Sequence, residues 1–284
     1  MGLTFVPTPL GNLRDITLRA LDVLRESALV VAEDTRVARR LLSAHGITGK
    51  ALLSYREQNA AQVTPLILAR AREENVALVT DAGMPGVSDP GRELLNAARD
   101  AGIGVDVLPG AVAFVGAAVL SGFSLDGLRF NGFVPRANGA RRAAFGAALE
   151  GGATSAWYEA PNRIIATLDA LAEVDPEVSV FVLREWTKRF EQQAAGTAAE
   201  VKAALEQPVR GEIVLVVGPR GRRDRVESAH RDLDTAIDAA LDAGLPPAAA
   251  AKALARERGA PRSEIYARVS ERKRMRSGKP PRER

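Results

Sequence analysis

The stretch V-A-L-V-T-D-A-G-M-P-G-V-S-D-P-G, residues 76–91, joins an apolar run to a segment rich in glycine and proline. Its first five residues are typical of a buried strand in a parallel sheet. Pro90 stands where a following helix would begin, and Gly102 stands where that helix would end. The pattern predicts a strand, a constrained loop and a helix, with the loop at the carboxyl end of the strand. Ligands bind there in open α/β sheets, although a single loop of this kind is also compatible with an ordinary tight turn.

Apolar strand-like runs alternate with helical patterns over the first 112 residues. Strands are predicted near residues 3–7, 28–32, 76–80 and 104–110. Helical patterns lie between them, the first with Asp15 as its expected N-cap. This βαβ rhythm predicts an N-terminal α/β domain over residues 1–112, built on a parallel sheet covered by helices.

A second α/β domain is predicted over residues 113–221. It follows from the apolar helix A-V-A-F-V-G-A-A-V-L-S-G and strand candidates at 129–134, 155–159, 178–183 and 212–217. Thr197 and Glu200 form the sequence pattern of a capping box, which predicts a short helix there. We expect some antiparallel pairing in this domain.

The last quarter of the chain has a different character. The charged run R-G-R-R-D-R interrupts the α/β pattern near residue 222. Three helix-length segments separated by Gly and Pro follow, and they predict a helix-turn-helix-like module over residues 228–275. Residues 276–284 read as a disordered basic tail.

Charge is distributed unevenly along the chain. Residues 220–284 contain 17 Lys and Arg against 10 Asp and Glu, whereas residues 1–219 contain 22 basic and 25 acidic side chains. The positive surplus therefore lies wholly in the last quarter. This asymmetry is compatible with a polyanion partner such as nucleic acid, or with a solvated tail.

Composition excludes several kinds of site. Hydrophobic residues make up 46% of the chain and charged residues 26%, as in globular proteins, and there is no cysteine for a disulfide, a thiolate metal site or a nucleophile. The only histidines are His45, expected to be solvated at a helix end, and His230, so we expect no metal site. No apolar segment reaches the ~20 residues of a membrane span and no signal peptide is evident, which predicts a cytoplasmic protein without a membrane partner.

Several loops at predicted strand ends carry small or chain-bending residues, although the G-x-G-x-x-G and P-loop signatures are absent. Glycine and proline in such loops let backbone groups approach a ligand closely. The segments are V-P-T-P-L-G-N-L-R-D-I-T-L-R-A-L, V-A-E-D-T-R, D-A-G-M-P-G-V-S-D-P-G, L-P-G, F-N-G-F-V-P-R, Y-E-A-P-N-R and G-E-I-V-L-V-V. Taken in order, they resemble the tetrapyrrole methylase superfamily and, within it, the ribosomal RNA small subunit methyltransferase I family.

The resemblance spans about residues 6–217, and the C-terminal helices resemble a region that follows in many members. It implies two α/β domains with S-adenosylmethionine in the cleft between them, and a homodimer. It also implies transfer of a methyl group to the ribose 2′-hydroxyl of a decoding-centre cytidine in the 16S RNA of the small ribosomal subunit. The expected cofactor-binding residues are Pro9, Leu10, Asp81, Ala82, Gly83, Met84, Pro85, Val87, Ser88, Pro109, Gly110, Ala111, Val112, Ala160, Pro161, Gly211 and Glu212.

Two positions depart from the family pattern. Members usually have Thr where this chain has Met84, and P-G-P-S-A where it has P-G-A-V-A at residues 109–113. Both changes remove hydroxyl groups near the expected cofactor. If cofactor contacts are made by the backbone, little is lost; if a hydroxyl takes part, about 1 kcal/mol is lost for each neutral hydrogen bond.

Methyl transfer needs an oxygen nucleophile in line with the methyl group, and a carboxylate can accept the hydroxyl proton. The candidates for this catalytic role are Glu33, Asp34 and Glu159, each of which also fits a helix N-cap or a salt bridge with Arg36 or Arg163. Candidate contacts to RNA phosphates are Arg36, Arg136, Arg141, Arg142 and Arg163, of which Arg141 and Arg142 fit a solvated helix start equally well.

Two other functions are compatible with the same fold. One is a methyltransferase acting on a small molecule such as a tetrapyrrole, against which the basic C-terminal module and the segment A-E-D-T-R argue. The other is a non-catalytic RNA-binding assembly factor with a vestigial pocket, supported by the hydroxyl groups lost at Met84 and residues 111–113. Cofactor titration would discriminate the assembly factor from an enzyme.

Overall fold

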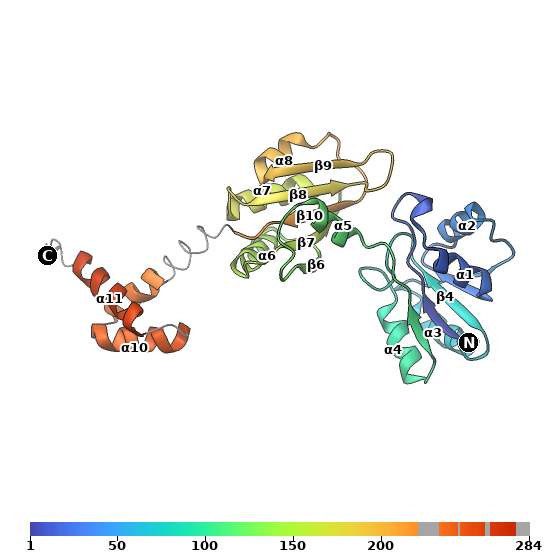
Figure 1. The fold of residues 1–284 in the computed structure, drawn as a ribbon, viewed down its shortest axis with the longest axis horizontal. Helices are drawn as coiled ribbons and strands as arrows, with labels where there is room; N and C mark the ends of the chain where they lie inside the picture. Colours follow the sequence, from blue (N-terminus) through green and yellow to red (C-terminus); the bar gives the residue numbers. More distant parts are fainter. Residues whose placement is uncertain (221–232, 244, 259–261, 277–284) are drawn as a thin grey trace. The chain divides into compact units, whose positions relative to one another are not determined.

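The computed structural model describes residues 1–220, 233–243, 245–258 and 262–276. The chain divides into two compact units, Met1–Pro219 and Arg220–Arg284, and each is described by itself (Figure 1). In the described part, no helix combines the length and apolar character that crossing a membrane requires.

The first unit begins with an all-parallel five-stranded sheet in the order β3-β2-β4-β1-β5. Its strands are β1 (Gly2–Phe5), β2 (Leu29–Ala32), β3 (Ala51–Ser54), β4 (Asn75–Val79) and β5 (Val105–Val107). The connecting helices are the 3₁₀ turn η1 (Leu13–Asp15), α1 (Leu18–Glu26), α2 (Thr35–Ala44), α3 (Ala60–Glu73) and α4 (Arg92–Asp100).

Both faces of the first sheet are buried, which explains its continuous apolar runs. Val30 and Ala32 of β2 pack in one core with residues of α1 and α2. Leu29 and Val31 of the same strand pack in a second core with residues of α3 and α4. The N-cap of α1 is Thr17, whose side chain accepts the Ala20 N–H, and Asp15 lies in the preceding turn η1. The cap predicted at Asp15 is therefore wrong.

A second five-stranded sheet follows in the same unit, in the order β6-β7-β10-β8-β9. Only the β6–β7 pair is parallel, and the other pairs are antiparallel. The strands are β6 (Arg129–Phe133), β7 (Ser155–Glu159), β8 (Ser179–Arg184), β9 (Gln192–Thr197) and β10 (Ile213–Val217). The helices are α5 (Ala113–Leu120), α6 (Asn138–Glu150), α7 (Ile164–Val174) and α8 (Ala198–Ala204).

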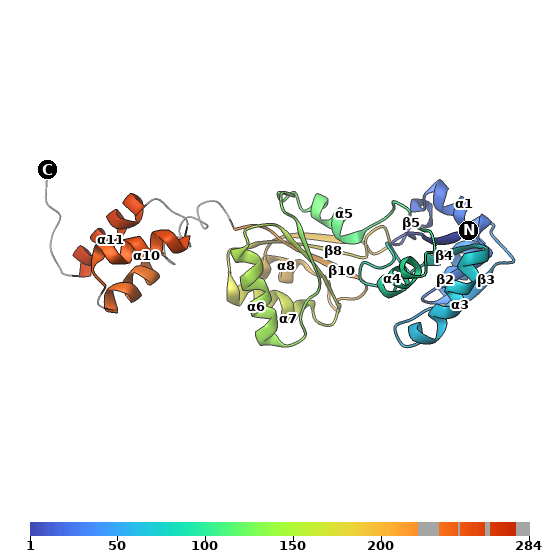
Figure 2. The same ribbon diagram turned by 90° about the horizontal axis from the view of Figure 1, so that it is seen from below.

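Helices cover this second sheet unequally. Figure 2 shows α5 on one face and α6, α7 and α8 on the other. Leu183 and Val214 point to the α5 face, and Val182 and Leu215 to the opposite core. The capping box predicted at Thr197 and Glu200 is present at the start of α8.

The second unit contains a helical segment at residues 233–243, followed by α10 (Pro247–Arg258) and α11 (Arg262–Arg276). Ile237, Leu254 and Val269 form part of its apolar core. Arg268 makes two hydrogen bonds to the carboxylate of Asp234, which joins the last helix to the first described segment.

The predicted α/β fold with a helical C-terminal region is confirmed, including the antiparallel pairing. Two strands, β3 and β9, were not predicted. Both lie at sheet edges and neither is fully buried, so their sequences A-L-L-S and Q-Q-A-A-G-T lack a long apolar run. The described residues do not include 221–225 of the predicted linker, His230, or 277–284 of the predicted tail.

Candidate functional site

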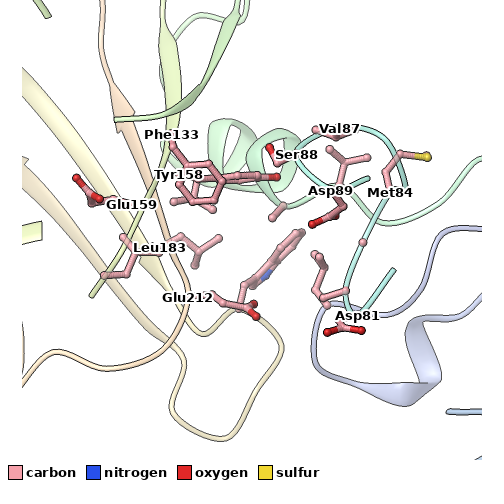
Figure 3. Close-up of a pocket in the computed structure, with 18 of the residues that line it drawn as sticks. Asp81, Met84, Val87, Ser88, Asp89, Phe133, Tyr158, Glu159, Leu183 and Glu212 are labelled. Carbon is pink, nitrogen blue, oxygen red and sulfur yellow. The ribbon is translucent and has the colours of Figure 1, made fainter. Parts of the chain in front are cut away.

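A cavity of about 340 Å³ lies between the loops of the first sheet and the strands of the second (Figure 3). This volume falls within the range of about 300–1,000 Å³ that is typical of small-molecule sites. Its lining residues are Leu10, Glu33, Asp81, Ala82, Gly83, Met84, Val87, Ser88, Asp89, Val112, Ala113, Phe133, Tyr158, Glu159, Leu183, Trp186, Glu212, Ile213 and Val214.

The first wall of the cavity is the loop that follows β4. Thr8 and Gly83 exchange two backbone hydrogen bonds of 2.9 and 3.0 Å, so this loop is joined to the loop that follows β1. Gly83 has a φ of 81°, which L-residues rarely adopt. A Cβ at Gly83 would also lie 3.1 Å from the side chain of Leu10, which itself lines the cavity. Glycine therefore lets the two loops meet closely at the carboxyl ends of β1 and β4.

The second wall is made by neighbouring strands of the mixed sheet. Because β10 runs antiparallel to β7 and β8, its first residues lie beside their last ones: Val214 pairs with Tyr158 and with Leu183. The Phe133 ring lies 5.7 Å from the Tyr158 ring in an edge-to-face arrangement. This wall is therefore apolar and aromatic.

Trp186 completes the wall from the loop between β8 and β9. The residues on either side of it, Glu185 and Thr187, have φ of 52° and 64° and are the only non-glycine residues with positive φ in the described part of the chain. A Cβ at Gly116 of α5 would overlap the Trp186 indole. The backbone N–H of Asn12 donates to the Thr187 hydroxyl at 3.1 Å, which ties this loop to the loop that follows β1. Trp186 thus lies between two residues of unusual backbone conformation, and its indole packs closely against α5.

Carboxyl groups dominate the electrostatics of the cavity, and its lining residues include no Lys, Arg or His. Burial, followed by repulsion from Glu33, Asp81 and Glu212, raises the pKa of Asp89 to about 6. Burial also raises the pKa of Glu33 and of Asp81. Figure 3 shows the carboxyl groups of Asp81, Asp89 and Glu212 around the same open space. The cavity is therefore suited to a ligand that carries positive charge.

The three candidate proton acceptors have different surroundings. Glu33 lines the cavity. Asp34 is the N-cap of α2: it accepts the Arg36 N–H at 2.8 Å, and its carboxylate pairs with the Arg36 guanidinium at 2.6 Å. This hydrogen bonding to Arg36 holds the pKa of Asp34 well below its usual range.

Glu159 is enclosed by its own hydrogen bonds. Its side chain is fully buried, accepts bonds from the Ala160 N–H and the Thr167 hydroxyl, and pairs with Arg163 at 3.3 Å. In Figure 3 its carboxylate lies apart from those of the other labelled acids. The surroundings of Asp34 and Glu159 are thus those of an N-cap and a salt bridge.

Two of the candidate RNA-binding arginines are held by backbone carbonyl groups, and the other three are exposed. Arg141 is buried and donates to the backbone carbonyls of Pro135 and Arg136, and Arg163 donates to those of Val134 and Pro135. Arg142 pairs with Glu173 of α7. Arg136 is exposed, and the Arg36 side chain is 79% exposed despite its pairing with Asp34.

The structure brings part of the predicted cofactor set together. The predicted residues that line the cavity are Leu10, Asp81, Ala82, Gly83, Met84, Val87, Ser88, Val112 and Glu212. The others do not line it: Pro9, Pro85, Pro109, Gly110, Ala111, Ala160, Pro161 and Gly211. Gly110 packs on the Pro7 ring, and a Cβ at Gly211 would overlap the Glu185 side chain, so these glycines allow close packing behind the lining.

Sequence reasoning missed most of the second wall. The missed lining residues are Asp89, Ala113, Phe133, Tyr158, Leu183, Trp186, Ile213 and Val214. The second-wall residues among them lie in or beside apolar strands and read as core. Asp89 was within the opening motif, but its proximity to Glu33 and Glu212, which are distant along the chain, is created by the fold. No group of three or more His, Cys, Asp or Glu is placed to hold a metal ion in the described part of the chain.

Comparisons with known proteins agree with this architecture. Residues 2–202 match the family model of the tetrapyrrole (corrin/porphyrin) methylases. Among solved structures, a cobalamin biosynthetic enzyme, cobalt precorrin-4 methyltransferase, aligns with a TM-score of 0.60 at 18% identity over 76% of this chain and 94% of that one. Diphthine synthase aligns with a TM-score of 0.59 at 16% identity over 76% of this chain and 89% of that one. At these identities the likeness shows the fold alone.

Closer relatives share most of the sequence length. The ribosomal RNA small subunit methyltransferase I of Neisseria meningitidis serogroup B is 40% identical over 93% of this chain and 91% of its own. The protein of the same name from Streptococcus pyogenes serotype M1 is 38% identical over 93% of each chain. The chain therefore belongs to the tetrapyrrole methylase family and, within it, to the ribosomal RNA small subunit methyltransferase I family.

Proposed function

We propose that the protein transfers a methyl group from S-adenosylmethionine to the ribose 2′-hydroxyl of a decoding-centre cytidine in the 16S RNA of the small ribosomal subunit. The observation that carries the proposal is the cavity, which combines several carboxyl groups with an aromatic wall and has no basic lining residue. The names of relatives that align along nearly the whole chain support RNA as the acceptor.

The cavity residues fit this cofactor chemically. When bound, S-adenosylmethionine supplies a methyl group on a positively charged sulfur. Carboxylates of Asp81 and Glu212 favour that positive charge, and the apolar side chains opposite them suit a flat heterocycle. Because Gly83 has no side chain, the loop that follows β4 can approach the cofactor closely and contact it with backbone groups. If the contacts are made by the backbone, the absence of a side-chain hydroxyl at Met84 costs little affinity.

We assign acceptance of the 2′-hydroxyl proton to Asp89, with Glu33 as the second candidate. Efficient general bases have a pKa near the working pH, and the pKa of Asp89 is raised to about 6. Asp34 fits this role less well, because Arg36 lowers its pKa and a weak base accepts a proton poorly. Holding both reactants in line accounts for most of the remaining acceleration.

RNA binding is assigned to groups outside the acidic cavity. Arg36 and Arg136 are exposed cations of the first unit. In the C-terminal unit Lys252, Arg256 and Lys273 are exposed, and they are candidates for phosphate contacts that strengthen binding at low salt. A homodimer acting in the cytoplasm is part of the same proposal, and sedimentation of the purified protein tests the dimer.

The direct test measures methylation of small subunits purified from a strain that lacks the gene. Wild-type protein and labelled S-adenosylmethionine should introduce one methyl group, located by mass spectrometry on the ribose of a 16S cytidine. Label in the base rather than the ribose would refute 2′-hydroxyl transfer. Cofactor binding without any labelled RNA would favour a small-molecule acceptor, and no cofactor binding would favour an assembly factor.

A further inference from the structure

The loop between β8 and β9, residues 185–191, joins the cavity to the outer surface of the first unit. Trp186 at its beginning lines the cavity, and Arg189 and Phe190 near its end are exposed. Because consecutive residues span at most ~3.6 Å each, the Cα of Phe190 lies within about 14 Å of the Cα of Trp186. The exposed pair therefore lies close to the cavity.

Phe190 is unusually exposed for a large aromatic residue, at 64% of its surface. The Arg189 guanidinium lies over the Phe190 ring, 5.5 Å from its centroid. Within the described part of the chain, no carboxylate pairs with Arg189. The two side chains thus present a flat aromatic surface beside an uncompensated positive charge.

The loop that carries this pair is well fixed. The Thr187 N–H donates to the Glu191 carboxylate at 2.9 Å, and the Glu191 N–H donates to the Lys188 carbonyl at 3.2 Å. Lys188 pairs with both Glu185 and Glu212, at 3.0 and 2.9 Å. With the backbone held in this way, exposure of Phe190 does not follow from a loosely packed loop end.

The acidic cavity also determines where phosphates can lie. Its carboxyl groups repel an RNA backbone, so only the nucleotide that reacts can enter, and the neighbouring phosphates must remain outside. Cations outside the cavity must hold those phosphates, and unpaired bases next to the reacting nucleotide need stacking partners. Aromatic rings and arginine planes are the groups that stack on single-stranded bases.

We propose that Arg189 and Phe190 bind an unpaired stretch of RNA next to the nucleotide that enters the cavity. Phe190 stacks on one base, and Arg189 contacts the adjoining phosphate. This inference rests on the proposed function for the identity of the polymer, but it concerns a surface that the cavity chemistry does not include.

The first test measures binding of a fluorescently labelled unpaired RNA of about ten nucleotides, compared with a duplex of the same sequence. Phe190→Leu keeps the apolar surface but removes the ring, and it should weaken binding of the unpaired RNA about tenfold, whereas Phe190→Tyr should retain it. Arg189→Gln should weaken binding and reduce its salt dependence. The matched controls Leu66→Ala and Arg72→Gln, at exposed positions of α3, should leave binding unchanged.

The second test measures methylation of small subunits. Phe190→Leu should raise the KM for subunits about tenfold, with kcat and cofactor affinity near wild type. Unchanged RNA affinity and KM in a variant of an active enzyme would overturn this inference alone. An inactive wild type would refute the methylation proposal, while the binding test would still decide on the RNA surface. If Phe190→Leu instead dissociates a dimer without changing RNA affinity, the pair is a contact between copies and the inference is wrong.

Discussion

The two sheets of the first unit contribute to the cavity in different ways. The parallel sheet supplies loops at its strand ends, held by backbone hydrogen bonds such as those between Thr8 and Gly83. The mixed sheet supplies side chains of the strands themselves, such as Tyr158, Leu183 and Val214. The carboxyl groups with raised pKa, Glu33, Asp81 and Asp89, all come from loops of the first sheet.

The loops of the first sheet thus supply most of the cavity's charge and the strands of the second its shape, with Glu212, which directly precedes β10, as a charged exception. Loops can place ionisable groups at a cavity edge where water still solvates them in part, whereas strands packed against α5 offer a fixed apolar surface. On this interpretation, substitutions in the loops of the first sheet, the charge half of the cavity, alter proton transfer and charge complementarity. Substitutions in the strands of the second sheet, the shape half, alter how well a flat ligand fits.

The largest effect is expected from the charge half, at Asp89. Asp89→Asn removes the proposed proton acceptor while preserving size, so the single-turnover methylation rate should fall by roughly 100-fold or more at saturating cofactor. Rapid-quench measurement with labelled cofactor and small subunits tests this. An unchanged rate would leave Glu33 as the candidate or attribute catalysis to positioning alone.

The same variant should be more stable than the wild type at alkaline pH. The folded protein raises the pKa of Asp89 from 3.8 to about 6, so the folded state favours the protonated carboxyl. The stability contributed by that group is fully present below pH ~4 and is lost as the pH rises through about 6. The Tm of Asp89→Asn should therefore exceed that of the wild type at pH 8, and the difference should shrink toward pH 5. A constant difference would contradict the raised pKa.

A substitution in the shape half should act on affinity rather than on proton transfer. Gly116→Ala favours helix formation in α5 but places a methyl group into the Trp186 indole, which must then move. Affinity for S-adenosylmethionine, measured by calorimetry, should fall about tenfold, equivalent to ~1.4 kcal/mol.

Gly146→Ala in α6 is the matched control for this experiment. A Cβ there meets no other atom within 4 Å, so cofactor affinity should be unchanged. Equal affinities of the two variants would mean that Trp186 does not shape the cofactor site.

Removing the C-terminal helical unit tests whether the two sheets of the first unit bind the cofactor without it. A chain ending at Pro219 retains both sheets and every lining residue, so cofactor affinity should match the full chain. It loses the positive surplus of the last quarter, so affinity for small subunits should fall several-fold and depend less steeply on salt. Binding titrations at several salt concentrations measure this. Identical slopes would assign the unit to dimerisation or stability instead.

The comparison also explains what the sequence could predict. The charge half was predictable because glycine and proline mark places where the chain must bend, and several such loops occur in a fixed order. The family resemblance that these loops carry placed Asp81, Gly83 and Ser88 in the expected cofactor site, and they line the cavity. The shape half was not predictable, because Tyr158 and Val214 lie within apolar strands that any buried sheet would contain.

Some chemistry depends on proximity that only the fold creates. The pKa of Asp89 follows from burial and from repulsion by Glu33, Asp81 and Glu212, of which only Asp81 is near Asp89 in the sequence. Trp186 was missed because neither the positive φ of its neighbours nor the space left by Gly116 can be inferred from residue type. That Arg141 and Arg163 donate to backbone carbonyls likewise does not follow from residue type.

The smallest effect is expected at Asp34, which lies in the charge half but faces its own helix. Its side chain accepts the Arg36 N–H and pairs with the Arg36 guanidinium, so its negative charge is already engaged. Asp34→Asn should leave the methylation rate nearly unchanged, because Asn caps helices about as well as Asp. Asp34→Ala should lower the free energy of unfolding by about 1 kcal/mol without a larger loss of activity. Chemical denaturation and single-turnover rates measure the two effects. A rate loss in Asp34→Asn comparable to that in Asp89→Asn would show that capping and proton transfer are not separated within this half, and Asp34 would then return as the proton acceptor.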